Sequence, residues 1–551
     1  MDNVKRCFRF KNCALFLALC SAGVMIERVE AVQMDLGDSD WKLRWDNTIK
    51  YSQAWRLQGQ DSRLLNAPTA NGLYPSIQSQ GDKNFNKGLV SNRLDLFSEM
   101  DLSRKNYGLR VSGAAWYDDI YNQDTDSKEQ PHFLRETRKL HGRDGEILDA
   151  FVFLRGDLGE DSQGVVRLGR HSLIYGESLF YGGNGIANAQ GPTDVVKLLS
   201  VPGTQFKEIL RPVNQISGQL QINPQLSVGA YYQFEWERSN LPGAGSYLSD
   251  VDAIGYGSGA LHEVFGNDTV NGGDLKPRNS GQGGMQIRFK PTGTELELGF
   301  YAAQYHDKTP IGLYAYLDGA AAAATGLPIL GSYRQVYAED IKTAGFSFST
   351  AYGPFNFAGE TSVRWNAPLV SNLQVVAPGI DADGDGDNHS LFARGKTAHA
   401  NLSAIYLLSP TAFWDGGSAL AELAWNRTLS ITENAAALDS NTTRDATALR
   451  VLVEPAYFQI VDGIDLTVPI GMGVVLDGRS SAVNKSGFGN THSGDWSVGL
   501  KATYLQRWDV GLNYVNFFGA PKAGLREDGN FSYGQSLADR DFVSLYVKTS
   551  F

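Results

Sequence analysis

Apolar and polar residues alternate along most of this chain, and the pattern recurs from Trp41 to the last residue, Phe551. In the segment 41–57 the odd positions are mainly Trp, Leu, Ile and Tyr, whereas most even positions are charged or hydroxylated. Neighbouring side chains of a β-strand point to opposite faces, so this period of two predicts strands with one apolar and one polar face. No stretch after Ala31 reaches the roughly 20 apolar residues that a membrane-spanning helix needs.

The segments between the predicted strands alternate strictly between short and long. This arrangement is typical of outer-membrane barrels, which have an even number of strands, short periplasmic turns and long extracellular loops. The sequence therefore predicts an all-β protein: a transmembrane up-and-down antiparallel β-barrel of eighteen strands. The strands are expected at 41–57, 94–104, 109–118, 148–155, 164–171, 213–222, 226–238, 282–290, 295–305, 336–350, 355–366, 396–408, 417–428, 446–457, 464–475, 495–505, 508–518 and 541–551.

The membrane environment requires the barrel to close. The hydrocarbon core of a bilayer offers the backbone no hydrogen-bond partners, so a sheet can cross it only when no strand edge is left open. The last strand, 541–551, is therefore expected to pair with the first, 41–57. Phe551 also resembles the terminal aromatic signal that the outer-membrane assembly machinery recognises. A large soluble β-structure, such as a propeller or a sandwich, is the alternative. The sequence lacks the blade repeat of about 40–50 residues that a propeller requires.

Residues 1–31 have the features of a secretory signal peptide: early basic residues, an apolar run at 13–26 and small residues before a cleavage site after Ala31. A retained signal anchor is the alternative, although the run is shorter than a spanning helix. Residues 32–551 then form one barrel domain in the outer membrane of a Gram-negative cell. All three cysteines lie in the leader, and its removal takes the net charge from −11 to −13, because it carries five Lys and Arg but three Asp and Glu. An acidic chain without a basic run is a poor nucleic-acid binder.

The polar face of the predicted strands is expected to line a water-filled lumen. Barrels of about 16–18 strands are too wide for their own side chains to fill. Charges of both signs are interleaved on this face, so they either pair across strands and stabilise the wall or form a selectivity lining. The lumen candidates are Arg44, Arg167, Glu360, Arg364, His399, Glu422, Arg450 and Glu454.

Two long connections are more apolar than exposed loops usually are. Segment 172–212 is the candidate for a constriction inside the lumen, with an external flap as the alternative, and Thr193 or Asp194 is a possible cap of one short helix. Segment 310–330, "PIGLYAYLDGAAAAATGLPIL", is nearly free of charge. We expect it to pack within the barrel mouth; contact with lipopolysaccharide or a partner, or capture of an apolar solute, are the alternatives.

One segment resembles a metal site. In "DADGDGDNHS", residues 381–390, the residues Asp381, Asp383, Asp385 and Asp387 follow the alternation of a calcium loop. Phe392 stands where such a loop has a bidentate Glu, so the match is partial, and a plain acidic loop is the alternative. Any calcium would stiffen the loop, and no other cofactor is indicated. The sequence contains no nucleophile elbow and no HExxH pair, so we do not expect an enzyme.

Several segments together resemble the domain-of-unknown-function 1302 family of exported Gram-negative proteins. They are "VVRLGRHSLIYGESLF" (165–180), "YAEDIKTAGFSFST" (337–350), "GETSVRWNAPL" (359–369), "LAELAWNR" (420–427) and "LTVPIGMGV" (466–474). The resemblance implies a porin-like barrel linked to the breakdown or export of hydrophobic compounds, and a periplasmic partner protein. It adds Arg170, Glu177 and Asp340 to the lumen candidates. Arg170 is in phase with the lipid-facing Val166 and Leu168, so it lies beyond the rim unless a bulge turns it inward.

These observations favour an outer-membrane channel for passive passage of small hydrophobic or amphipathic compounds of the lipid, steroid or aromatic type. The alternatives are a general hydrophilic porin and a non-transporting barrel that serves as a docking platform for periplasmic partners. The expected surroundings are outer-membrane lipid and lipopolysaccharide.

Overall fold

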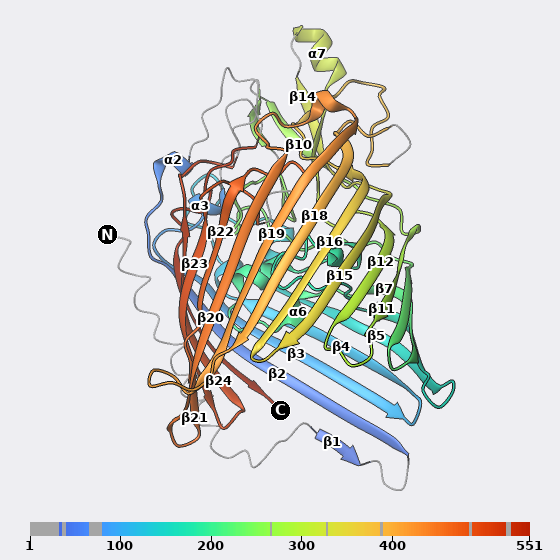
Figure 1. Ribbon diagram of the computed structural model, residues 1–551. Helices are drawn as coiled ribbons and strands as arrows, with labels where there is room; N and C mark the ends of the chain where they lie inside the picture. Colours follow the sequence, from blue (N-terminus) through green and yellow to red (C-terminus); the bar gives the residue numbers. More distant parts are fainter. Residues whose placement is uncertain are drawn as a thin grey trace.

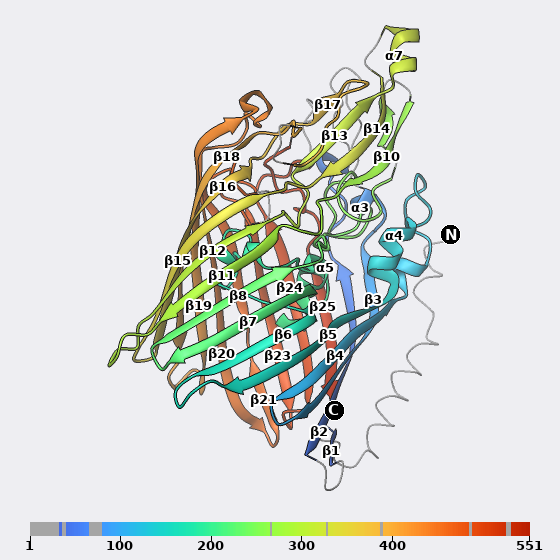
Figure 2. The same cartoon turned by 90° about the vertical axis from the view of Figure 1, so that its right-hand side faces the viewer.

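The computed structural model describes residues 32–35, 40–65, 80–259, 261–264, 267–326, 329–385, 389–483, 487–524 and 531–551; the predicted leader, 1–31, lies outside the described residues. Its main feature is a closed antiparallel β-barrel of eighteen strands (Figures 1 and 2). All eighteen predicted strands are present. They are β2 (Trp41–Arg56), β3 (Gly88–Arg104), β4 (Tyr107–Asp118), β5 (Arg143–Asp157), β6 (Gln163–His171), β7 (Val213–Asn223), β8 (Leu226–Gln233), β11 (Gln282–Phe289), β12 (Glu297–Tyr305), β15 (Ile341–Tyr352), β16 (Phe355–Pro368), β18 (Arg394–Leu407), β19 (Gly416–Glu433), β20 (Asp445–Val461), β21 (Ile464–Thr467) continued by β22 (Ile470–Gly478), β23 (Gly494–Tyr504), β24 (Trp508–Phe518) and β25 (Phe542–Ser550).

The barrel closes as the sequence predicts, because β25 pairs with β2 from Ser550 opposite Thr48 to Phe542 opposite Arg56. Asn47 and Phe551 exchange both backbone hydrogen bonds, at 2.8 and 2.9 Å, so pairing extends to the last residue. Below this point the short strand β1 (Val32–Asp35) continues along the same edge of β2. The strand predicted at 464–475 is interrupted between β21 and β22, where Pro469 cannot donate to a ladder.

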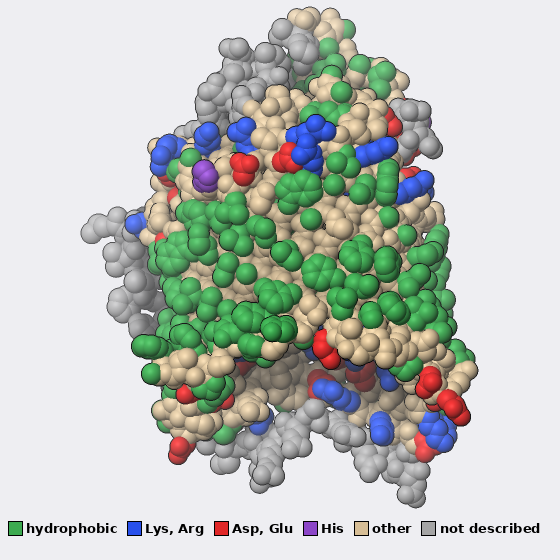
Figure 3. All heavy atoms as spheres, viewed as in Figure 1, with side chains coloured by type: hydrophobic (Ala, Val, Ile, Leu, Met, Phe, Trp, Pro, Cys, Tyr) green, Lys and Arg blue, Asp and Glu red, His purple; other side chains and the backbone are tan. Residues whose placement is uncertain are grey.

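The outer surface of the barrel is apolar at mid-height. Figure 3 shows a broad hydrophobic band with charged side chains above and below it. Exposed aliphatic side chains at alternate strand positions form the band, among them Leu94, Leu96, Val152, Leu154, Val166 and Leu168. Exposed aromatic residues lie near both borders, Tyr107 and Tyr352 by the short turns and Tyr117 and Tyr232 by the long loops, as in transmembrane barrels.

Charges on the inner face mostly form ion pairs between neighbouring strands. Arg110 contacts Asp101 at 2.7 Å, and Lys548 contacts Asp509 at 3.1 Å. Such pairs satisfy charges that a purely apolar wall could not accommodate. Within the described residues, no helix is both long and apolar enough to cross a membrane.

The short turns lie at one end of the barrel and the long loops at the other (Figures 1 and 2). Above the long-loop end stands a second sheet, in the order β17-β13-β14-β10-β9. Its strands are β9 (Leu261–Val264), β10 (Asn267–Leu275), β13 (Gly312–Leu317), β14 (Leu330–Val336) and β17 (Gln374–Val376). The long connections also contain α2 (Ser62–Leu65), α3 (Gln80–Lys83), η2 (Ile120–Asn122), α4 (Arg135–Thr137), η3 (Arg138–Gly142), η4 (Ile186–Ala189), α5 (Val195–Ser200), α6 (Phe206–Ile209), α7 (Gly319–Thr325) and η5 (Ala435–Ala437).

The start of the apolar segment 310–330 packs at the barrel mouth as we expected, because Ile311 and Tyr314 share a buried cluster with Tyr305 and Ile341 at the strand ends and with Ala189 of the connection after β6. Most of the rest belongs to the second sheet. Tyr314 and Ala315 of β13 are buried, and β13 pairs with β14 and β17. The alanines of α7 are partly or fully exposed at the tip of the molecule (Figure 1). The apolar character of the segment therefore serves β-sheet packing in its strands, and only α7 presents small side chains to solvent.

Candidate functional site: a loop folded into the barrel

The connection between β6 and β7, residues 172–212, folds into the barrel. It carries η4, α5 and α6, which lie inside the ring of strands in both ribbon views (Figures 1 and 2). Its side chains and backbone contact inward-facing residues of β16, β18 and β19 on one wall and of β2, β3 and β5 on another. The inner segment, as we call residues 172–212, therefore crosses the lumen, and the alternative of an external flap is wrong.

Glu360 of β16 holds the first part of the inner segment. Its two carboxylate oxygens accept the backbone N–H groups of Glu177, at 2.5 Å, and Ile186, at 2.9 Å. Glycine is required on both sides of this carboxylate, because a Cβ at Gly176 or Gly185 would overlap its oxygens, and Gly176 also has a φ of +95°. The carboxylate is 6% exposed, so these bonds are shielded from bulk water.

Glu422 of β19, two strands along the wall from β16, is a second carboxylate that clamps the inner segment. It accepts the backbone N–H of Phe180 at 2.5 Å, the N–H of Tyr181 at 3.0 Å and the hydroxyl of Ser178 at 2.9 Å. Asn401 of β18 donates to the same carboxylate at 2.8 Å and to the Ser178 oxygen at 3.0 Å. The side chain of Glu422 is fully buried, and its charge is compensated by these converging donors.

Arg364 of β16 binds backbone carbonyl groups of the same segment, whereas the two carboxylates bind backbone N–H groups. Its guanidinium donates to the carbonyls of Gly183, Asn184 and Gly185, at 3.1, 2.9 and 2.9 Å. The Asn184 side chain donates to Asn401 at 2.6 Å, and its oxygen faces the Nδ1 atom of His399 at 3.0 Å. Two carboxylates and one guanidinium thus fix the turn at 176–186 through its main chain.

The second part of the inner segment is held by ion pairs. Asp194 caps α5 as predicted, accepting the Lys197 N–H at 2.8 Å. The Lys197 ammonium contacts Glu146 of β5 at 2.8 Å, and that of Lys207 contacts Glu99 of β3 at 3.6 Å. Lys50 of β2 donates to Thr204 at 3.3 Å.

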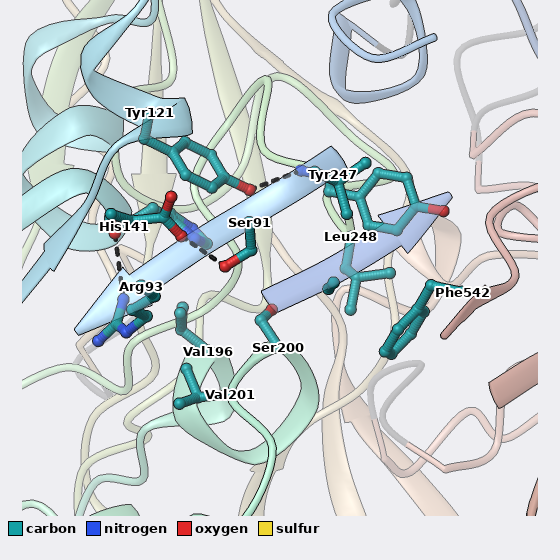
Figure 4. Close-up of a pocket in the computed structure, with 13 residues that line it drawn as sticks. Ser91, Arg93, Tyr121, His141, Val196, Ser200, Val201, Tyr247, Leu248 and Phe542 are labelled. Atoms are coloured by element: carbon teal, nitrogen blue, oxygen red, sulfur yellow. Dashed lines mark hydrogen bonds between the residues drawn. The ribbon is translucent and has the colours of Figure 1, made fainter. Parts of the chain in front are cut away.

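A small cavity lies where α5 meets the upper wall (Figure 4). Val196, Ser200 and Val201 of the inner segment face residues of β3 and the external loops across it. Arg93 donates to the His141 carbonyl at 3.1 Å, and Tyr247 donates its N–H to the Tyr121 hydroxyl at 3.1 Å. Burial, together with the charge of Arg93, lowers the pKa of His141 to about 3, so this ring is neutral. The inner segment and the long loops therefore line the same cavity at this level of the barrel.

The lumen side of the inner segment is apolar. In α5, Val196 and Lys197 are buried against the wall, whereas Leu198 is 57% exposed and Leu199 44% exposed. At 3.6 residues per turn, these two leucines lie on the face opposite to the wall contacts. Phe206 of α6 is 62% exposed, next to Lys207, which contacts the wall. Three large apolar side chains therefore lie uncovered inside a barrel whose own inner face is mostly polar.

The remaining lumen candidates are dispersed. Arg44 contacts Asp46 at 2.6 Å near the short-turn end, and Arg450 contacts Asp495 at 2.5 Å. Arg167 lies on β6 opposite Phe153, and Glu454 lies on β20 opposite Ser418. Neither of the last two forms an ion pair with another residue that the structure describes.

Three candidates added by the family resemblance lie at different levels. Glu177 is in the inner segment and binds Arg288 of β11. Asp340 is at the rim, where it contacts Arg278 at 2.5 Å and Gln304 at 3.0 Å. Arg170 lies near the end of β6, where β6 pairs with both neighbours without a register shift. It contacts Glu235 at 2.9 Å at the end of its strand.

The predicted calcium loop brings only part of its ligands together. Asp383, Asp385 and His389 have potential ligand atoms within 4.8 Å of one another, and Asp381 is not in this group. Asp387 lies outside the described residues. His389, which we did not include, supplies the third group, and bound calcium stays a prediction.

One serine and one histidine meet in the barrel wall. The Nε2 atom of His171 lies 2.7 Å from the Ser217 hydroxyl, but its Nδ1 atom faces the Gly169 carbonyl at 3.0 Å in place of a carboxylate. His171 is 1% exposed and Ser217 6%. Both side chains are therefore almost completely shielded from solvent.

Sequence reasoning missed what the clamp residues do. Strand parity predicts that Glu360, Arg364, His399 and Glu422 face the lumen, where they pair across strands or line the channel. The structure brings all four together on the inner segment. Asn184, Asn401 and Ser178 were not singled out. The one sequence signal for the clamp is the glycine pattern of "YGESLFYGGNG", residues 175–185, which fits a main chain held at close range.

The fold and the site together define a closed, lipid-compatible β-barrel whose lumen is crossed by a chain segment between its fifth and sixth strands. The chain belongs to the family described as "Protein of unknown function (DUF1302)", whose model matches residues 12–551. No curated protein matches the sequence.

Similar solved structures include OccAB3 of Acinetobacter baumannii, at 9% identity and a TM-score of 0.41, covering 92% of this chain and 99% of that one. A BenF-like porin from Pseudomonas fluorescens Pf-5 has 9% identity and a TM-score of 0.38, with 92% and 98% covered. The outer membrane protein opdK from Pseudomonas aeruginosa has 10% identity and a TM-score of 0.38, with the same coverage.

Proposed function

We propose that this protein is an outer-membrane channel through which small hydrophobic or amphipathic compounds pass without an energy source. The apolar outer band and the edgeless sheet suit a barrel embedded in lipid, with the long loops outside the cell. A leader removed after residue 31 would export it, and Phe551 would be read by the assembly machinery. No catalytic step is proposed.

The observation that carries the proposal is the uncovered apolar face of the inner segment. Leu198, Leu199 and Phe206 remain exposed although the polar side chains beside them are engaged with the wall. Exposed apolar side chains on this scale usually mark contact with a ligand or partner. Within a lumen, they provide a surface along which a steroid or aromatic acid can move while it leaves bulk water.

The test is a flux series in liposomes with solutes of matched size, one polar and one apolar at each size. Replacing Leu198, Leu199 and Phe206 together with serine should slow aromatic acids and steroids at least fivefold while sugars pass at an unchanged rate. Leu134, exposed in an external loop, provides the control through Leu134→Ser. If the triple variant slows sugars and steroids equally, the apolar face does not select, and a general hydrophilic porin is the better description.

A barrel that acts as a docking platform for periplasmic partners is the second candidate function. It predicts that the wild-type protein neither conducts ions nor passes any of these solutes. The flux series therefore separates the two classes directly.

A further inference from the structure

Basic side chains collect on the outer face of the barrel, at the border between the apolar band and the long loops. Figure 3 shows Lys and Arg side chains in a row along the upper edge of the hydrophobic band. The same edge is where exposed aromatic residues such as Trp365 lie. A row of cations at this level faces the headgroups of the lipid leaflet, and not the lumen or the loops.

The sheet register identifies the residues in one part of this row. Lys342 of β15 lies opposite Trp365 of β16, and Lys396 of β18 lies opposite Ser430 of β19. Lys342 and Lys396 are exposed, and both alternate with the buried positions Thr343 and Thr397, so they share the lipid-facing side. Strands are about 4.8 Å apart, which places the two lysines roughly 10 Å apart with the indole between them.

The cations at this border are only partly neutralised. Lys342 and Lys396 form no ion pair with any residue of the described ranges. Arg427 of β19 contacts Asp445 at 3.2 Å, while Arg444 donates to the carbonyls of Thr428 and Leu429, at 2.8 and 2.7 Å. Arg444 thus forms hydrogen bonds with carbonyl groups at the rim and no ion pair with a carboxylate of the described residues.

We propose that Lys342 and Lys396, flanked by Arg444, bind the phosphate groups of lipid A in the outer leaflet. This proposal rests on the proposed function only for the outer-membrane location and for the side on which the long loops lie. The glucosamine backbone of lipid A carries a phosphate at each end, so one lipid can present two anions to two separated cations. Trp365 between the lysines would contact the sugar and upper acyl region, as interfacial aromatic residues do.

The experiment measures binding of lipid A to the purified, full-length barrel in detergent containing EDTA, by native mass spectrometry. The variant is K342Q/K396Q, and the matched control is K105Q/K290Q, which removes two exposed lysines from the short-turn end. Each lysine near an anionic lipid surface contributes about fivefold to affinity, so the first variant should bind diphosphoryl lipid A roughly 25-fold more weakly. The control should bind as the wild type does, and lipid A without phosphates should not distinguish the three proteins.

Equal binding of diphosphoryl lipid A by all three proteins would overturn the proposal, as would equal binding of lipid A with and without phosphate by the wild type. Heat-modified migration on gels verifies that each variant is a folded barrel. Conductance measured on the same preparations distinguishes the two proposals. A barrel that conducts but does not bind lipid A refutes only the lipid A site at Lys342 and Lys396. A barrel that binds lipid A but does not conduct refutes only the channel.

Discussion

Removing the two carboxylate clamps should free the inner segment from the wall of β16–β19. Glu360 accepts two main-chain N–H groups, and Glu422 accepts two more together with the Ser178 hydroxyl. The perturbation is the double variant Glu360→Ala and Glu422→Ala, which deletes both acceptors and leaves the β-ladders untouched.

The magnitude is worked out for each carboxylate as a whole. A hydrogen bond to a charged group contributes about 1.5–3 kcal/mol, and lumen water can replace part of what is lost. We take a net loss of about 1.5 kcal/mol per carboxylate, or about 3 kcal/mol for both. This shifts the ratio of released to clamped segment about a hundredfold, since about 1.4 kcal/mol corresponds to a factor of ten.

The assay is single-channel recording in planar bilayers. The double variant should have larger mean current and frequent transitions between levels, because the segment leaves and rejoins the wall. Glu454→Ala is the control: it removes a lumen-facing charge from β20 that forms no hydrogen bond or ion pair with the residues that the structure describes. Identical currents in the wild type, the double variant and the control would refute the reasoning.

Three further predictions use other parts of the chain. Gly185→Ala should raise channel current as the loss of Glu360 does, because its Cβ would displace that carboxylate, whereas Gly183→Ala, which has open space around it, should not; single-channel recording of both decides this. Burial lowers the pKa of Lys308, in the loop after β12, to about 7, so the unfolding free energy of the wild type should decrease as the pH falls from about 10 to 7 and then stay constant. Urea titrations of Lys308→Met should lack this pH dependence. The same change of unfolding free energy with pH in both proteins would contradict the prediction. If the loop 381–390 binds calcium, added Ca²⁺ should raise the melting temperature of the wild type by a few degrees but not that of D383N/D385N, and equal shifts would place the ion elsewhere.

The barrel could be predicted from the sequence because its cause is local. Lipid outside and water inside impose a period of two on every strand, and this period is visible without knowledge of any neighbour. The predicted bounds of one strand were wrong, because the alternation of apolar and polar residues continues where the chain passes from one sheet to the other. Residues 336–350 look like one strand, but Asp340 has a φ of +58°, and the chain passes there from the second sheet to β15.

The site could be predicted only in part. Strand parity correctly places Glu360, Arg364 and Glu422 on the inner face, but it cannot show that a distant loop brings main-chain donors to them. Lumen-facing carboxylates that bind water and carboxylates that bind a loop have the same sequence pattern.

The two ends of the inner segment are held by interactions of different strength, and this decides where the constriction can move. At 176–186 the partners are buried carboxylates and a guanidinium bound to main chain, which a change of salt or side-chain rotamer does not release. At 197–208 the contacts are Lys–Glu pairs, and the Lys207 side chain is 46% exposed, so its pair with Glu99 is weak and screened by salt. Leu198, Leu199 and Phe206 lie in this second part. Phe206 is therefore on the most easily released part of the segment, whereas Leu198 and Leu199 are next to Lys197, whose pair with Glu146 is buried and keeps them close to the wall.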